Sequence, residues 1–259
     1  MKSKTFYQIA FSQYDKKINV KIPKLNNKLL AYEIGVHLGD GSMQIVPKKT
    51  HSVRYWGDSN EDWLFVSEVL PKIIKELYNK NVIARKCNDS NKCVLSVCSK
   101  AIATFKRDII GLPAGNKKQI KGLPKFVKKN RNLLINCLRG IGDTDFGLYF
   151  HRDGTPGLAC IMSNKDLIED IGQEIRNLGI DAKIKFDIIR MRKGKQNIEH
   201  HVKIYCKKNL EKWMKIISFE NPKHLTKYLC WKHLNFSKNR TTVKQRTIML
   251  EEAGIFPTS

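Results

Sequence analysis

The sequence has no long hydrophobic run, and this absence disfavours a protein that crosses a membrane. No apolar stretch approaches the roughly 20 residues that span a bilayer, and the first residues lack the hydrophobic core of a signal peptide. We therefore expect a soluble, intracellular protein, in the cytoplasm or an organelle lumen, that is neither secreted nor bound to a membrane.

Paired cysteines are also missing. The seven cysteines are scattered along the chain, and no two of them form a C-x-x-C pair. A structural zinc site takes paired ligands, and a disulfide framework takes an even number of cysteines at regular spacings. The cysteines are therefore predicted to be reduced thiols, most of them buried.

Acidic residues are half as numerous as basic ones. The 259 residues include 48 Lys and Arg against 24 Asp and Glu, which gives a formal net charge of +24. A surplus of this size repels itself, so its most direct physical use is to bind a polyanion such as nucleic acid. The basic residues are spread along the chain instead of forming one cluster, which disfavours an anionic membrane surface as the partner.

Two stretches about a hundred residues apart share one design. Residues 31–43 read A-Y-E-I-G-V-H-L-G-D-G-S-M, and residues 138–149 read L-R-G-I-G-D-T-D-F-G-L-Y. Each is a glycine-spaced apolar run, typical of a helix, that ends on an aspartate, Asp40 or Asp145. A second pair of similar segments, around Cys98 and Cys206, recurs at nearly the same offset, so we predict an internal duplication.

Each half is predicted to follow the order α-β-β-α-β-β-α. In the first half the expected helices cover residues 25–40, 61–78 and 99–110, and the strands cover 42–47, 52–56, 82–87 and 93–98. In the second half one helix ends at residue 145, and two more cover 164–178 and 208–217. The strands of this half cover 147–152, 157–162, 182–191 and 198–206. The predicted domains are an N-terminal arm (1–23), a first repeat (24–122), a second repeat (123–225) and a basic C-terminal tail (226–259).

The glycines of the two helical runs predict that these helices pack against each other. Glycine in a helix interior costs about 1 kcal/mol relative to alanine, and small residues at this spacing let two helix backbones approach closely. Asp40 and Asp145 would then lie side by side, where the two charges repel each other and the helix dipoles oppose both.

A hard divalent cation, Mg²⁺ or another such as Mn²⁺, would remove this conflict between the two carboxylates. The alternative is that both aspartates are ordinary residues of helix ends and turns. A metal held by two acids in a strongly basic protein predicts phosphodiester hydrolysis.

The two stretches resemble the motif of the LAGLIDADG homing endonucleases, which maps to residues 33–41 and 138–146. The resemblance implies an α+β fold of two pseudo-symmetric repeats, each with a curved antiparallel sheet, packed through the motif helices in one monomeric chain. It also implies that Asp40 and Asp145 bind the catalytic metal and that each sheet enters the DNA major groove. Glu33 and Phe146 depart from the motif, and Asp143 is interpreted as a structural or capping residue.

The resemblance also implies basic side chains near the metal, and Lys118 and Lys223 are the candidates by their position after the closing helix of each half. DNA contact is expected from the open face of each sheet, where the alternation of residues 183–188 places Lys183 and Lys185. The candidate DNA-binding residues are Lys48, Lys49, Arg54, Arg85, Arg152, Lys183, Lys185, Arg190, Arg192, Lys193, Lys195 and Lys203.

The sequence therefore predicts a Mg²⁺-dependent, site-specific double-strand DNA endonuclease, encoded within an intron or standing free. Two alternatives share the same fold. One is an RNA maturase, which would bind intron RNA as a splicing cofactor, and the other is a metal-independent DNA-binding regulator.

Overall fold

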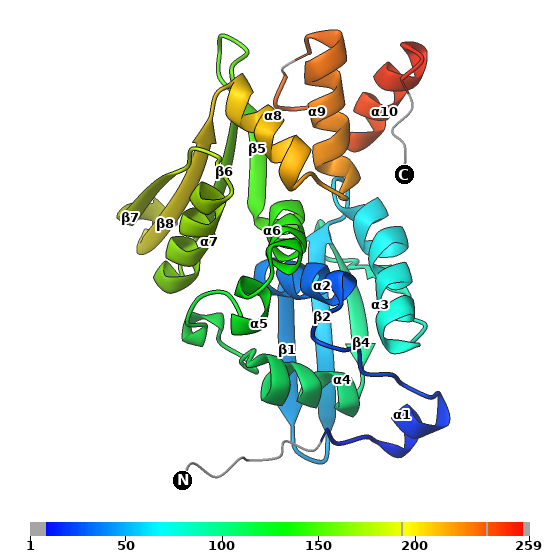
Figure 1. Cartoon of the computed structure of the whole chain (residues 1–259). Helices are drawn as coiled ribbons and strands as arrows, with labels where there is room; N and C mark the ends of the chain where they lie inside the picture. Colours follow the sequence, from blue (N-terminus) through cyan, green and yellow to red (C-terminus); the bar gives the residue numbers. More distant parts are fainter. Residues whose placement is uncertain (1–8, 193, 237, 256–259) are drawn as a thin grey trace.

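The chain forms two similar halves that meet at a pair of central helices (Figure 1). The structure is a computed structural model that describes residues 9–192, 194–236 and 238–255. The candidate DNA-binding residue Lys193 lies outside this range.

The two halves have the same order of elements. The first half contains α2 (Lys28–Gly39), β1 (Gly41–Val46), β2 (Thr50–Asp58), α3 (Leu70–Tyr78), β3 (Ala84–Lys86), β4 (Lys92–Cys98) and α4 (Lys100–Thr104), with π-helical turns η1 (Phe65–Val69) and η2 (Phe105–Ile110). The second half contains α6 (Arg131–Asp145), β5 (Phe146–Phe150), β6 (Pro156–Met162), α7 (Lys165–Asn177), β7 (Lys183–Arg192), β8 (Lys195–Tyr205) and α8 (Lys207–Ile216). The predicted order α-β-β-α-β-β-α is confirmed in both halves.

Each half carries a four-stranded antiparallel sheet with the same strand order. The orders are β1-β2-β4-β3 and β5-β6-β8-β7. Helices α3 and α4 lie on one side of the first sheet, and α7 and α8 lie on one side of the second (Figure 1). Alternate residues such as Val53 and Val202 are buried against these helices, which leaves the opposite face of each sheet uncovered. The predicted α+β fold is therefore confirmed.

Several predicted element ends differ from the structure for local reasons. The first helix begins at Lys28 instead of residue 25 because the Asn27 side chain caps it, accepting from the backbone N–H of Leu29 at 2.7 Å. The helix expected over residues 61–78 is divided into the π-helical turn η1 and α3 just before Pro71, since proline has no N–H for a regular helical bond. The predicted six-residue turn before β8 is wrong, because β7 and β8 pair as far as Arg192 and Lys195.

The described residues outside the two repeats also form helices. The N-terminal arm contains α1 (Gln13–Lys17), whose buried Asp15 accepts hydrogen bonds from Ser99 at 2.7 Å and from the N–H of Lys100 at 3.1 Å, at the start of α4. The connection between the halves contains η3 (Lys117–Gln119) and α5 (Lys125–Lys128). The C-terminal tail forms α9 (Pro222–Leu234) and α10 (Val243–Glu252), and α9 runs through residue 225, the predicted end of the second repeat. Within the described residues, no helix could span a bilayer.

The core of the first half contains a buried ion pair between Glu33 and Lys106. The Glu33 carboxylate, fully buried, accepts from the Lys106 ammonium at 2.6 and 2.8 Å and from the hydroxyls of Tyr55 and Tyr78. This explains why a charged residue occupies a motif position that is usually apolar. The motif alignment places Leu138 at the position of Glu33, and the alignment around Cys98 and Cys206 places Met214 at the position of Lys106, so both corresponding residues of the second half are apolar.

Replacing Glu33 alone should destabilise the protein more than replacing the whole ion pair. Glu33→Leu leaves the Lys106 ammonium buried without a partner, which costs about 3 to 5 kcal/mol. Glu33→Leu with Lys106→Met copies the second half and should recover at least about 2 kcal/mol of that loss, the remainder reflecting the two tyrosine hydroxyls. Urea unfolding measures both variants, and a double variant as unstable as the single one would contradict the expectation.

Candidate metal and DNA-binding site

The two motif helices touch through their glycines. A Cβ atom built on Gly35 would lie 3.1 Å from Gly140 Cα and would overlap the carbonyl of Cys137, so only glycine fits at this crossing. The same is true of Gly39, where a Cβ would overlap the side chains of Thr144 and Asp145. The predicted close packing of these helices is therefore confirmed.

This contact brings the two motif aspartates together. Asp40 is the C-cap of α2, and Asp145 is the last residue of α6. The Asp145 carboxylate lies against Gly39, which is the residue directly before Asp40. The structure therefore joins the ends of two helices that are about a hundred residues apart in the sequence.

Both carboxyl groups are held where their charged forms are unfavourable. Burial and, to a smaller extent, the negative charges of Asp145 and Asp62 raise the pKa of Asp40 to about 7. Burial likewise raises the pKa of Asp145 to about 6. The ammonium groups of Lys117 and Lys223 act in the opposite direction on both pKa values, so the site is a cluster of acids partly compensated by two lysines.

The residues present fit a hard divalent cation. One carboxylate oxygen of Asp145, Oδ2, is buried and has no hydrogen-bond partner, which is unusual for a buried oxygen. The protein ligands of such a cation would be carboxylate oxygens, which Mg²⁺ and Mn²⁺ accept readily. Among the described residues, no group of three or more His, Cys, Asp or Glu side chains surrounds one point, so water and substrate oxygens would complete the coordination shell.

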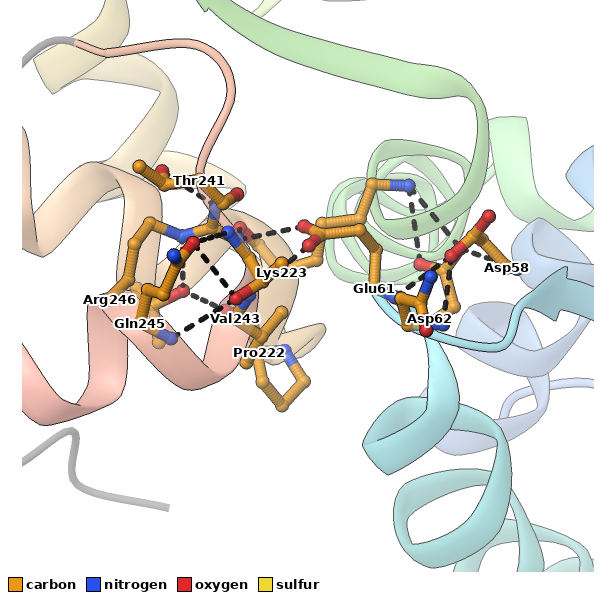
Figure 2. Close-up of polar contacts among 12 residues, drawn as sticks. Asp58, Glu61, Asp62, Pro222, Lys223, Thr241, Val243, Gln245 and Arg246 are labelled. Atoms are coloured by element: carbon orange, nitrogen blue, oxygen red, sulfur yellow. Dashed lines mark hydrogen bonds and ion pairs between the residues drawn. The ribbon is translucent and has the colours of Figure 1, made fainter. Parts of the chain in front are cut away.

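The two candidate lysines occupy similar turns but have different partners. In each turn an asparagine caps the backbone N–H two residues later: Asn116 caps Lys118, and Asn221 caps Lys223. The Lys223 ammonium lies 3.2 Å from Asp62 Oδ1 (Figure 2). Lys118 is exposed and lines a cavity of about 280 Å³ together with Asp145.

Two residues at the site were not predicted as functional. The ammonium of Lys117 donates to the carbonyl oxygens of Gly39 and, at 3.1 Å, of Leu38, so it lies closer to the end of α2 than Lys118 does. Asp62 was predicted only to start a helix, yet it pairs with Lys223 and contributes to the raised pKa of Asp40. The sequence contains two adjacent lysines at 117–118, and only side-chain direction distinguishes them.

Asp143 has the structural role that was predicted. Its buried carboxylate accepts from the Tyr32 hydroxyl at 2.6 Å and from the backbone N–H groups of Glu220 and Asn221 at 3.0 and 2.9 Å. These bonds hold α6 to the start of α9. With its oxygens satisfied by donors, Asp143 is not available as a metal ligand.

Phe146 does not move Asp145 away from the helix end. It is the first residue of β5 and pairs with Cys160, as Gly41 is the first residue of β1. Its ring is buried against Trp213, with the ring centroids 4.8 Å apart. A side chain at Gly41 would lie 2.6 Å from the carbonyl oxygen of His37, so the glycine is required in the first half only.

A β-bulge aligns the basic residues of β7 on one face. Lys183 and Lys185 stand opposite Lys203 and His201 of β8, on the uncovered face of the second sheet. The register shifts between Lys185 and Ile188, where Asp187 has a φ of +55°. In a regular strand the two lysines, at odd-numbered positions, and Arg190 and Arg192, at even-numbered positions, would lie on opposite faces of the sheet. The bulge brings all four to the same face.

The aligned face continues to the tip of the hairpin. After the bulge, Arg190 stands opposite Asn197, and Arg192 opposite Lys195. Arg192 also pairs with Glu199 at 2.9 Å. The other candidates lie at comparable places: Arg54 and Arg85 on the uncovered face of the first sheet, and Lys48, Lys49 and Arg152 in exposed strand turns.

Removing the Asp40 charge should stabilise the metal-free protein at neutral pH. The raised pKa means that the folded state binds more protons than the unfolded state between about pH 4 and about pH 7, so the free energy of unfolding falls as the pH rises through this range. Asp40→Asn should therefore increase it by about 2 to 4 kcal/mol above that range and flatten its pH dependence.

Urea unfolding in a chelator measures this effect, with the exposed Asp181→Asn as the control. Added Mg²⁺ should stabilise the wild-type protein and have a smaller effect on Asp40→Asn. Equal stability of Asp40→Asn and wild type at every pH would contradict the expectation.

Comparison with known proteins supports the fold. No family model matches the sequence, and no curated protein matches it. Mesophilic variants of the homing endonuclease I-DmoI align with a TM-score of 0.51 and 16% identity over 75% of this chain and 98% of that one. I-DmoI in complex with DNA and Mn aligns with a TM-score of 0.50 and 16% identity, over 74% and 96% of the two chains. The chain therefore has the two-repeat fold of the single-chain LAGLIDADG homing endonucleases.

Proposed function

We propose that this protein is a site-specific endonuclease that hydrolyses both strands of duplex DNA with a divalent cation, Mg²⁺ in the first instance. The observation that carries the proposal is the pair of half-buried aspartates at the meeting point of α2 and α6, one of which has a buried carboxylate oxygen without a hydrogen-bond partner. Bringing two carboxylates together and removing them from water costs free energy unless a cation binds between them.

The surroundings of the pair suit phosphodiester chemistry. A cation bound there would polarise a phosphoryl oxygen, make hydroxide available from bound water and stabilise the leaving oxygen. Lys117 and Lys223, whose charges act on both aspartates, would bind phosphate oxygens and orient the attacking water. The excess of basic residues over the whole chain favours association with a long polyanion.

The two-fold arrangement suits a duplex. Each half contributes one aspartate and one sheet with basic residues on its uncovered face, so one chain presents two equivalent surfaces to two DNA strands. No second copy is needed to complete the aspartate pair, which favours a monomer. The similar fold of I-DmoI, solved with DNA and Mn, supports both the partner and the need for a divalent cation.

Cleavage of a library of duplex targets tests the proposal. With Mg²⁺, the wild-type protein should select and cut one long sequence, and Asp40→Asn or Asp145→Asn should each lower the rate by at least about 100-fold, which equals about 3 kcal/mol of transition-state stabilisation. The exposed Asp181→Asn is the matched control and should cut normally.

Two results would replace the proposal with an alternative. Absence of cleavage with any divalent cation, together with tight binding to a structured intron RNA, would indicate an RNA maturase. Specific duplex binding without cleavage would indicate a DNA-binding regulator.

The DNA-binding face has its own test. Arg190→Gln with Arg192→Gln should weaken duplex binding and lower the slope of log affinity against log salt by about 2, because each lost phosphate contact removes about one unit. Lys208→Gln with Lys215→Gln is the control, since it removes the same charge from α8, on the covered side of the sheet. Equal affinities of the two double variants would show that DNA binds elsewhere.

A further inference from the structure

The C-terminal segment from α9 to α10 is attached to both halves of the molecule. The side chain of Asn239 accepts from the N–H of Phe150 at 2.9 Å and donates to its carbonyl at 2.8 Å, along the free edge of β5. Arg246, which is buried, donates to Glu61 at 2.9 Å, to Thr226 at 3.0 Å and to the carbonyl of Lys223 at 3.2 Å (Figure 2). Phe150 belongs to the second half and Glu61 to the first.

A cavity of about 350 Å³ lies between this segment and the start of β5. We call it the C-terminal pocket, and its chemically important lining residues are Glu61, Gly147, Lys223, His224, Lys227 and Arg240. Gly147 is only two residues beyond Asp145, and Lys223 contacts Asp62, so the pocket adjoins the aspartate site.

Positive charge in the C-terminal pocket is not balanced by acids. Its one carboxylate, Glu61, already pairs with Arg246 and accepts from the N–H of Val243 at 3.2 Å. Among the described residues, neither Lys227 nor Arg240 has a carboxylate within ion-pair distance. The Lys227 ammonium instead lies over the ring of Phe150, 6.0 Å from its centroid.

Burial of Lys227 also makes its charge unfavourable. Burial, together with the positive charges of Arg246 and Lys223, lowers the pKa of Lys227 to about 8, and Glu61 acts in the opposite direction. An anion in the pocket would favour the charged lysine.

An unpartnered buried nitrogen lies in the same wall. His224 is 1% exposed, lines the C-terminal pocket, and has an Nε2 atom with no hydrogen-bond partner. A buried polar atom without a partner is rare in proteins. The pocket therefore combines two cations that have no ion-pair partner with an unpartnered buried imidazole nitrogen.

We propose that the C-terminal pocket binds a phosphate group of the DNA backbone beside the aspartate pair, which rests on the proposed function. Lysine and arginine together bind phosphate oxygens through short charge-assisted hydrogen bonds. The position next to Gly147 and Lys223 places that phosphate on the strand that passes Asp145. The C-terminal helices thereby extend the DNA contact beyond the two sheets.

Salt-dependent binding to random-sequence duplex DNA in a chelator tests this proposal without cleavage. Lys227→Met with Arg240→Gln should weaken binding about 3- to 10-fold and lower the salt slope by about 1, the effect of one lost phosphate contact. Lys232→Met with Lys244→Gln, exposed residues of α9 and α10 outside the pocket, removes the same charge as a control. Thermal unfolding of each variant checks that it folds.

Equal affinity and slope for the pocket and control variants would overturn the proposal. Titration with inorganic phosphate identifies the source of the ligand: if phosphate stabilises wild type but not the pocket variant, and duplex binding does not change, the pocket takes a free phosphate group and the DNA assignment fails. A wild-type protein that binds duplex DNA through this pocket but never cuts it would sink only the endonuclease proposal. Normal cutting with control-like binding would sink only the pocket.

Discussion

Gly35 and Gly140 let the backbones of α2 and α6 touch, and the arrangement of both sheets depends on that contact. Each helix runs directly into the first strand of its own sheet, so the crossing sets the positions of β1 and β5 relative to each other. It also places Asp40 and Asp145 at one point. A side chain at either glycine would separate the helices and, with them, the sheets and the acids.

The two halves share a topology but differ in the residues at corresponding positions of their cores. The first half buries Glu33 and Lys106 with two tyrosine hydroxyls, whereas the second has Leu138 and Met214 at the corresponding positions. The second half, in turn, has α9 and α10 attached to its sheet edge. A duplicated fold has therefore been adapted on each side separately, and the central contact was kept.

The repeated motif made most of the fold predictable from the sequence. A glycine-spaced run ending on an aspartate is visible in both halves, and the order of helices and strands along the chain is the same in both. Features that depend on side-chain direction were not predictable: Lys117 instead of Lys118 reaches the carbonyl groups at the end of α2. The bulge at Asp187 has no distinctive sequence signal either, yet it decides which face Arg190 and Arg192 occupy.

The hydrogen bond between Arg246 and Glu61 has a consequence for the order in which the chain acquires its structure. The two residues are 185 positions apart. At about 5 to 20 residues per second, the ribosome completes the first repeat many seconds before Arg246 emerges. During that interval Glu61 and Asp62 face solvent without Arg246 and Lys223. The first repeat must therefore fold with this acidic corner unpaired, and α10, which is made after both repeats, joins the two halves there.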